Sequence, residues 1–180
     1  KYCKENSEKV KIRRKKWYAK NIEEIKVKGK KYYHENYEKN QWDIRPNKNY
    51  FDELFRVSKN QIIWGGNYFI NYLYSSRGII SWDKKLGTPY NFSHFELAWT
   101  SFDCIARKII ISSNQRESDH PTEKPKELYR WLLKNYAKPC DKILDTHVGS
   151  ASSLIACIDM GFDYTGYELD KDYYDAACNR

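Results

Sequence analysis

The stretch Lys142-Ile143-Leu144-Asp145-Thr146-His147-Val148-Gly149-Ser150-Ala151-Ser152 carries the clearest structural signal in this 180-residue chain. An apolar strand ends in an acid, a loop of small residues with one glycine follows, and a helix begins at once. Glycine allows the backbone of such a loop to approach a ligand closely. The order of strand, loop and helix is typical of a ligand site at the carboxyl end of a parallel strand, and it also suits a plain strand–helix turn.

A second acid makes the ligand site the favoured interpretation. Glu168 follows Asp145 by 23 residues and lies at the end of the next expected strand, 164–169. Parallel strands end at the same edge of a sheet, where a carboxylate can accept hydrogen bonds from ribose hydroxyls. Because the loop lacks the pattern Gly-x-Gly-x-x-Gly, a dinucleotide with a pyrophosphate is less favoured.

The segment His120-Pro121-Thr122-Glu123-Lys124-Pro125 precedes this unit. Its two prolines restrict the backbone, and Pro125 lies where a helix can start. Thr122 and Lys124 would present a hydroxyl and a cation beside the first strand. The alternative is a loop that does no more than cap the following helix.

From residue 41 onward, short apolar runs alternate with amphipathic runs. This alternation predicts an α/β fold with a sheet of parallel strands. The expected helices are 50–57, 67–74, 125–136, 152–160 and one that begins near 171, and the expected strands are 61–64, 78–83, 96–102, 108–111, 142–145 and 164–169.

Residues 1–40 form a separate basic arm in the sequence. They hold 14 Lys and Arg against 6 Asp and Glu, whereas residues 41–180 hold 18 of each. Segments that begin at Lys1, Lys16 and Lys31 repeat with a period of 15, which keeps equivalent positions on one broad helical face. Such a helix, with Tyr and Trp between the cations, suits nucleic-acid phosphates and bases. The alternative is a solvated tether without a ligand.

Composition excludes several other classes of protein. The chain is 41% apolar and 16% aromatic, which argues against disorder. No apolar run is long enough to cross a membrane, and the first residues lack the apolar core of a secretory signal. The five cysteines form no Cys-x-x-Cys or Cys/His cluster, so we expect reduced thiols, no disulfide framework and no metal site.

Taken together, the motifs resemble the DNA amino-methyltransferases of bacteria and phages, in the permuted type whose cofactor motifs follow the catalytic half. The resemblance covers about residues 42–180. It is carried by Asp145–Ser152, by Tyr167-Glu168-Leu169-Asp170, by His120–Pro125, and by Gln61–Phe69 and Phe95–Phe102.

The resemblance implies a Rossmann-like sheet with S-adenosylmethionine as methyl donor. It implies that Glu168 takes the ribose hydroxyls, that Thr122 and Lys124 lie near the amino-acid end of the cofactor, and that Asn67 lies near the cofactor. The implied contacts from the loop are Asp145, Thr146, His147, Gly149, Ser150 and Ser152. Whether His147 does more than shape the loop stays open.

The implied substrate is double-stranded DNA, with N6-methyladenine as the product and N4-methylcytosine second. The target base must leave the duplex to reach the methyl donor. Trp99 either lines the pocket for that base or packs in the core. Recognition of the DNA sequence is expected from residues 84–94 and 112–120. The implied location is the cytoplasm of a bacterial host, for either a bacterial or a phage gene.

One family motif is missing. The catalytic tetrapeptide Asp/Asn/Ser-Pro-Pro-Tyr/Phe holds the target base, yet this sequence contains no Pro-Pro, and the lysine-rich repeat stands in the expected place. We therefore assign no catalytic residue. The sequence predicts either a partial chain or a gene whose catalytic start was exchanged for the repeat arm. If the motif is absent, one central strand of the sheet is missing too, and an exposed sheet edge or a compensating strand must then exist. Two alternatives to an active methyltransferase are an inactive module that binds cofactor and DNA, and an enzyme that uses another nucleotide.

Overall fold

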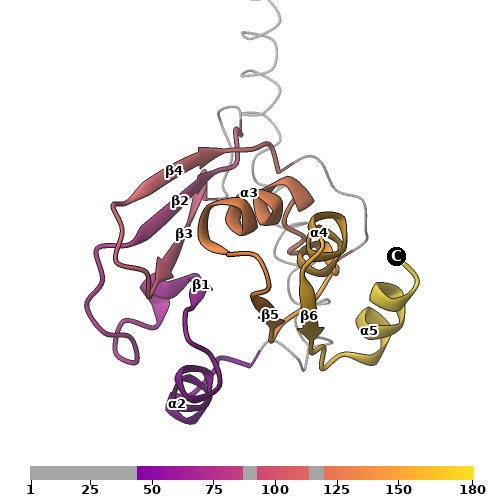
Figure 1. Cartoon of the computed structure of the whole chain (residues 1–180), viewed down its shortest axis with the longest axis horizontal. Helices are drawn as coiled ribbons and strands as arrows, with labels where there is room; N and C mark the ends of the chain where they lie inside the picture. Colours follow the sequence, from indigo (N-terminus) through magenta and orange to yellow (C-terminus); the bar gives the residue numbers. More distant parts are fainter. Residues whose placement is uncertain (1–43, 87–92, 114–119) are drawn as a thin grey trace, which may run out of the picture. The chain divides into compact units, whose positions relative to one another are not determined.

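The computed structural model describes residues 44–86, 93–113 and 120–180 (Figure 1). The expected basic arm, residues 1–40, lies outside these ranges, so its helix and its nucleic-acid contact stay predictions. The helical elements are α2 (Lys48–Val57), the short 3₁₀ helix η1 (Gly66–Tyr68), α3 (Lys126–Tyr136), α4 (Ser152–Met160) and α5 (Lys171–Cys178). None of the described helices combines the length and the apolar character needed to span a membrane.

Four strands form the first sheet, in the order β1 (Ile62–Trp64), β3 (Phe95–Thr100), β2 (Ile79–Asp83) and β4 (Arg107–Ile110). As expected, β2 and β4 are parallel. The expectation of parallel strands is wrong for β3, which runs antiparallel to both β1 and β2. The connection 84–94 is shorter than the dozen or more residues that a parallel crossover requires, so β2 and β3 pair in opposite directions.

The second sheet consists of β5 (Lys142–Asp145) and β6 (Asp163–Gly166), which are parallel and joined through α4. This is the strand–loop–helix–strand unit that the sequence predicts. Gly161 caps the C-terminus of helix α4 in the left-handed conformation, with a φ of 73°. The side chain of Asp170 then caps α5 by accepting the backbone N–H groups of Asp172 and Tyr173.

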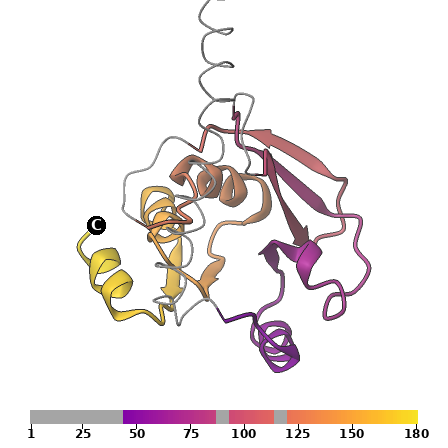
Figure 2. The ribbon, with the colours of Figure 1, turned by 180° about the vertical axis from the view of Figure 1, so that it is seen from behind.

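Helix α3 packs against the first sheet on one side and against α4 on another (Figures 1 and 2). Leu132 packs on the first sheet with Ile80 and Ala98. Its neighbour Leu133 packs with Ala156 of α4, which covers the second sheet. Successive helical residues point about 100° apart, so one helix buries side chains in two separate cores. The two cores therefore depend on the same helix.

The prediction of a helix over 67–74 is wrong. Only η1 forms there, and Tyr68 and Ile70 remain 68% and 69% exposed. Asparagine, aromatic and β-branched residues, which dominate this segment, have low helix propensity. Because these side chains stay largely exposed, the free energy of burial does not offset their low helix propensity.

In place of one continuous sheet, the described residues show two. Within the described ranges, β1 pairs only with β3, and β5 pairs only with β6. The break between β1 and β5 agrees with the expectation of a sheet that lacks one strand. Packing on α3, rather than a shared ladder of backbone hydrogen bonds, connects the two sheets in this part of the chain.

This arrangement predicts that both sheets unfold together. Leu133→Ala should lower the free energy of unfolding by about 2–5 kcal/mol, because it opens a cavity on the side of α3 that faces α4. Leu169→Ala is the control, since Leu169 is 81% exposed and should cost less than about 0.5 kcal/mol. Urea denaturation followed by tryptophan fluorescence and by circular dichroism measures both. Two separate transitions in Leu133→Ala would contradict the shared role of α3.

Candidate functional site

Asp145 organises the loop that joins β5 to α4. Its Oδ1 accepts the backbone N–H of His147 at 2.9 Å, and its Oδ2 accepts the hydroxyl of Ser153 in the first turn of α4. Backbone pairing continues beyond the strands, because the Tyr167 N–H donates to the Asp145 carbonyl at 2.9 Å and the Val148 N–H donates to the Tyr167 carbonyl at 3.0 Å. The predicted site residue Asp145 therefore acts first on the loop itself.

Gly149 and Glu168 meet at the carboxyl ends of β5 and β6, as the sequence predicts. The Gly149 N–H donates to Glu168 Oε2 at 2.8 Å, and the Asp170 N–H donates to Oε1 at 2.9 Å. Each carboxylate oxygen keeps a second lone pair, so Glu168 can hold the loop and still accept a hydroxyl from a ligand. Gly149 has a φ of 53°, and a Cβ on it would lie 3.0 Å from the ring of His120, so this position needs glycine.

The segment 120–125 packs directly on this loop. His120 is 9% exposed, and its ring lies 4.4 Å from the ring of Tyr173 on α5. Its Nδ1 accepts the backbone N–H of Thr122 at 3.3 Å. Thr122 is thus held by His120, whose ring lies against Gly149, and its place near the cofactor stays a prediction. Burial lowers the pKa of His120, although the nearby carboxylates of Glu168 and Glu123 oppose that effect.

Glu123 joins the same segment to α4. Its side chain is only 2% exposed, and it pairs with the guanidinium of Arg180 at 3.3 Å. The hydroxyl of Ser152 donates to it at 3.4 Å and lies 3.0 Å from the hydroxyl of Ser150. Ser150 and Ser152, both predicted as cofactor contacts, are buried.

Lys124 lies at the first sheet. Its ammonium is 3.2 Å from Glu96 on β3 and 5.8 Å from the centre of the Trp64 ring. Glu96 also pairs with Lys84 at 2.7 Å. Burial disfavours the charged carboxylate of Glu96, but the two lysines outweigh it and lower its pKa. Sequence reasoning named Lys124 and missed Glu96, which looked like an ordinary strand residue.

Tyr50 on α2 is a further residue that the sequence did not single out. Its hydroxyl lies 2.7 Å from Thr146 Oγ1, which lies 3.0 Å from Nδ1 of His147. The rings of Tyr50 and His147 are 5.5 Å apart in an edge arrangement. Burial raises the pKa of Tyr50, and the charge of Asp145 adds to this. The 96 positions between Tyr50 and Thr146 leave no local signal in the sequence.

Asn67 and Trp99 are not brought to the loop by these contacts. Asn67 is exposed in η1, and within the described part of the chain no hydrogen bond joins it to residues 145–152. Trp99 is 7% exposed, and its indole N–H donates to the Tyr74 carbonyl at 3.0 Å. The structure thus places Trp99 in the core, which is one of the two alternatives that the sequence leaves open.

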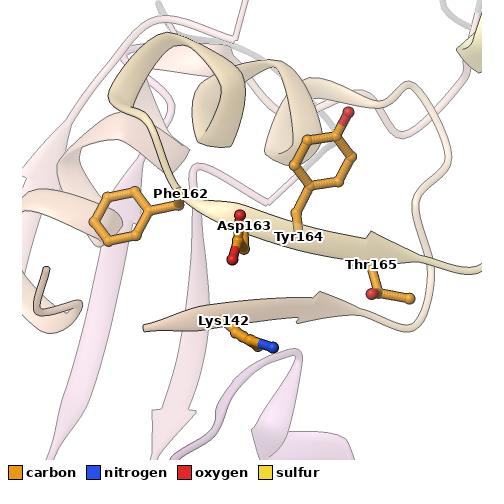
Figure 3. Close-up of a pocket in the computed structure, with 5 residues that line it drawn as sticks. All are labelled: Lys142, Phe162, Asp163, Tyr164 and Thr165. Atoms are coloured by element: carbon orange, nitrogen blue, oxygen red, sulfur yellow. The ribbon is translucent and has the colours of Figure 1, made fainter. Parts of the chain in front are cut away.

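A hollow of about 360 Å³ lies elsewhere on the second sheet (Figure 3). Lys142 and Asp163, which line it, form the first pair of the β5–β6 ladder, whereas Asp145 forms the last. Ligands of open α/β sheets bind at the carboxyl ends of the strands. The hollow is therefore separate from the candidate site.

The two segments expected to recognise DNA leave the first sheet together. The Lys84 N–H donates to the His94 carbonyl at 2.9 Å, and the Ser113 N–H donates to the Lys84 carbonyl at 3.1 Å. Within 84–94 and 112–120, residues 87–92 and 114–119 lie outside the described ranges. Both ends of the first segment and the start of the second thus meet at Lys84.

The sequence model of the DNA methylase family, N6_N4_Mtase, matches residues 1–179. The chain belongs to this family. It is 26% identical over 106 residues to the DNA adenine methyltransferase YhdJ of Escherichia coli, a match that covers 59% of this chain and 34% of YhdJ. It is 30% identical over 67 residues to the type II methyltransferase M.HpaI of Haemophilus parainfluenzae, covering 37% of this chain and 21% of that protein. The chain thus spans about a third or less of the length of these relatives.

The fold also matches a solved structure. A crystal structure of the M1.HpyAVI–SAM complex superposes with a TM-score of 0.55 and 21% identity, covering 67% of this chain and 73% of that one. This likeness shows a shared methyltransferase fold and confirms the expected fold class, with the sheet incomplete in the described residues.

The environment of His120 predicts a pH dependence. Since burial lowers its folded-state pKa below the ordinary 6.5, the unfolded chain takes up a proton that folded His120 does not. Stability should therefore fall as the pH drops through about 6.5 and level off below the folded pKa. Thermal melting between about pH 7.5 and 5 measures it, and His120→Asn, which keeps an acceptor for the Thr122 N–H, should flatten the profile. Equal slopes in both proteins would contradict the assignment.

Proposed function

We propose that this chain forms the cofactor-binding part of a DNA amino-methyltransferase that acts with S-adenosylmethionine on the N6 amino group of adenine. N4 of cytosine is the second choice of target. Membership of the DNA methylase family supports the proposal. The observation that carries it is the contact of Gly149 with Glu168 at the ends of two parallel strands, because it combines a close backbone approach with a carboxylate for a ribose.

The donor set suits this cofactor. Glu168 would accept the ribose hydroxyls while it holds Gly149. The hydroxyl of Thr122 and the ammonium of Lys124 would serve the amino-acid end, with Lys124 held by Glu96. When bound, S-adenosylmethionine supplies a methyl group on a sulfonium, which a base amino nitrogen attacks directly. The relative M1.HpyAVI has been crystallised in complex with SAM.

The proposed partner is duplex DNA with the target base flipped out, because an amino group inside the stack cannot reach the methyl donor. We propose that segments 84–94 and 112–120 contact the recognition sequence from their shared origin at Lys84. The basic arm, residues 1–40, would contact phosphates. Such an enzyme would work in the cytoplasm of a bacterial host, whether the gene is bacterial or carried by a phage.

The absence of Pro-Pro from the sequence favours a second candidate function. Without the tetrapeptide, no residue of this chain is assigned as the acceptor for the target amino group. The chain would then be a module that binds cofactor and DNA but transfers no methyl group. Cofactor binding is common to both functions, whereas methyl transfer separates them.

Calorimetric titration with S-adenosylmethionine tests the shared part. We expect binding that Glu168→Ala weakens about 10- to 100-fold, the range for loss of hydrogen bonds to a charged group. Glu127→Ala, at a partly exposed carboxylate on α3, should leave the affinity unchanged. Thermal melting checks that both variants are folded. A folded wild-type chain that binds no cofactor, or equal affinity in Glu168→Ala, would contradict the proposed site.

Transfer of a labelled methyl group to unmethylated DNA tests the reaction. For the enzyme, we expect label in N6-methyladenine after digestion of the DNA, with little incorporation into DNA already methylated at adenine. Label in N4-methylcytosine would show that the target base is cytosine instead of adenine. Cofactor and DNA binding without incorporation would identify the inactive module.

A further inference from the structure

Three polar groups form a short chain at the start of the loop after β5. The hydroxyl of Tyr50 lies 2.7 Å from Thr146 Oγ1, and Thr146 Oγ1 lies 3.0 Å from Nδ1 of His147. Tyr50 comes from α2, whereas the other two follow β5. Because the two sheets share no ladder within the described residues, this contact links the first half of the described chain to the loop of the second sheet.

The chemistry of the three groups favours one direction for the hydrogen bonds. A phenol is a stronger donor than an aliphatic hydroxyl, which favours the arrangement in which Tyr50 donates to Thr146 and Thr146 donates to Nδ1 of His147. The imidazole then carries its proton on Nε2. His147 is exposed, so this Nε2–H is a donor available to an oxygen atom of a ligand at the loop.

The packing of α2 holds Tyr50 in place. Its neighbour Phe51 is 1% exposed and contacts the rings of Phe69 and Tyr72 at 5.1 and 5.2 Å. The side chain of Asn47 caps the helix by accepting the backbone N–H of Tyr50 at 3.3 Å. The hydroxyl thus belongs to a rigid element, as a positioning group must.

We infer that Tyr50 is a positioning residue of the candidate site: through Thr146 it fixes the ring orientation and tautomer of His147, so that Nε2–H is presented to an oxygen acceptor of the ligand. The positioning stands on the contacts alone, and its effect on S-adenosylmethionine rests on the proposed function. This gives His147 a role beyond the shape of the loop. The role depends on a helix about a hundred residues earlier in the sequence.

Nitrogen-15 NMR of the imidazoles at about pH 8 tests the positioning. In the wild type, we expect His147 to be mostly the Nε2–H tautomer, with its signal assigned by His147→Gln. Tyr50→Phe should shift the tautomer population, and Thr146→Val should give the same shift, with no added effect in the double variant. Tyr72→Phe is the matched control, since that ring packs on Phe51 and, within the described residues, no hydrogen bond joins its hydroxyl to the loop. An unchanged His147 signal in Tyr50→Phe, or an equal shift in Tyr72→Phe, would overturn the inference.

Titration with S-adenosylmethionine tests the consequence for the ligand. Tyr50→Phe should weaken binding about three- to tenfold, the loss expected for one neutral hydrogen bond, and Tyr72→Phe should not. Unchanged affinity in Tyr50→Phe, beside clear binding by the wild type, would overturn the link to the cofactor. Absence of binding by the wild type would instead contradict the proposed function, while the NMR result would still decide whether Tyr50 positions His147.

Discussion

The carboxylate of Asp145 bonds to both sides of the turn between β5 and α4, and the candidate site depends on that closure. One oxygen accepts the N–H of His147 and the other accepts the hydroxyl of Ser153, so the loop is tied to the end of its strand and to the first turn of its helix. This closure places Gly149 where its N–H meets Glu168. An acid at the end of the strand is therefore needed before any ligand arrives.

Two other parts of the chain are built around that loop. The ring of His120 lies against the Cα of Gly149. Buried Glu123 accepts a hydrogen bond from the hydroxyl of Ser152 and forms an ion pair with Arg180. On another side of the loop, Tyr50 reaches Thr146 from α2. Segments from three regions of the sequence thus converge on one turn. Most of their hydrogen-bonding groups hold that turn. In the proposed function, the carboxylate of Glu168 and the ring of His147 are the groups that would contact a ligand.

The division of the sheet bears on how the candidate site is held. The sequence contains no Pro-Pro, and the described residues form two separate sheets. Helix α3 keeps the halves together because Leu132 and Leu133 are buried in different cores. The candidate site on β5 and β6 therefore forms although the sheet is not continuous in the described part of the chain.

By itself, the sequence determined the local units whose signals lie within about thirty residues: the β5–α4–β6 unit, its glycine loop, the acid at Glu168 and the helix after Pro125. Hydrophobic period, turn residues and caps are local properties, so they can be recognised without the fold. Tertiary structure alone decided the antiparallel direction of β3, the loss of a helix over 67–74, the burial of Trp99 and the contact of Tyr50 with Thr146. These depend on which distant side chains pack together, and a contact across 96 positions leaves no trace in local spacing.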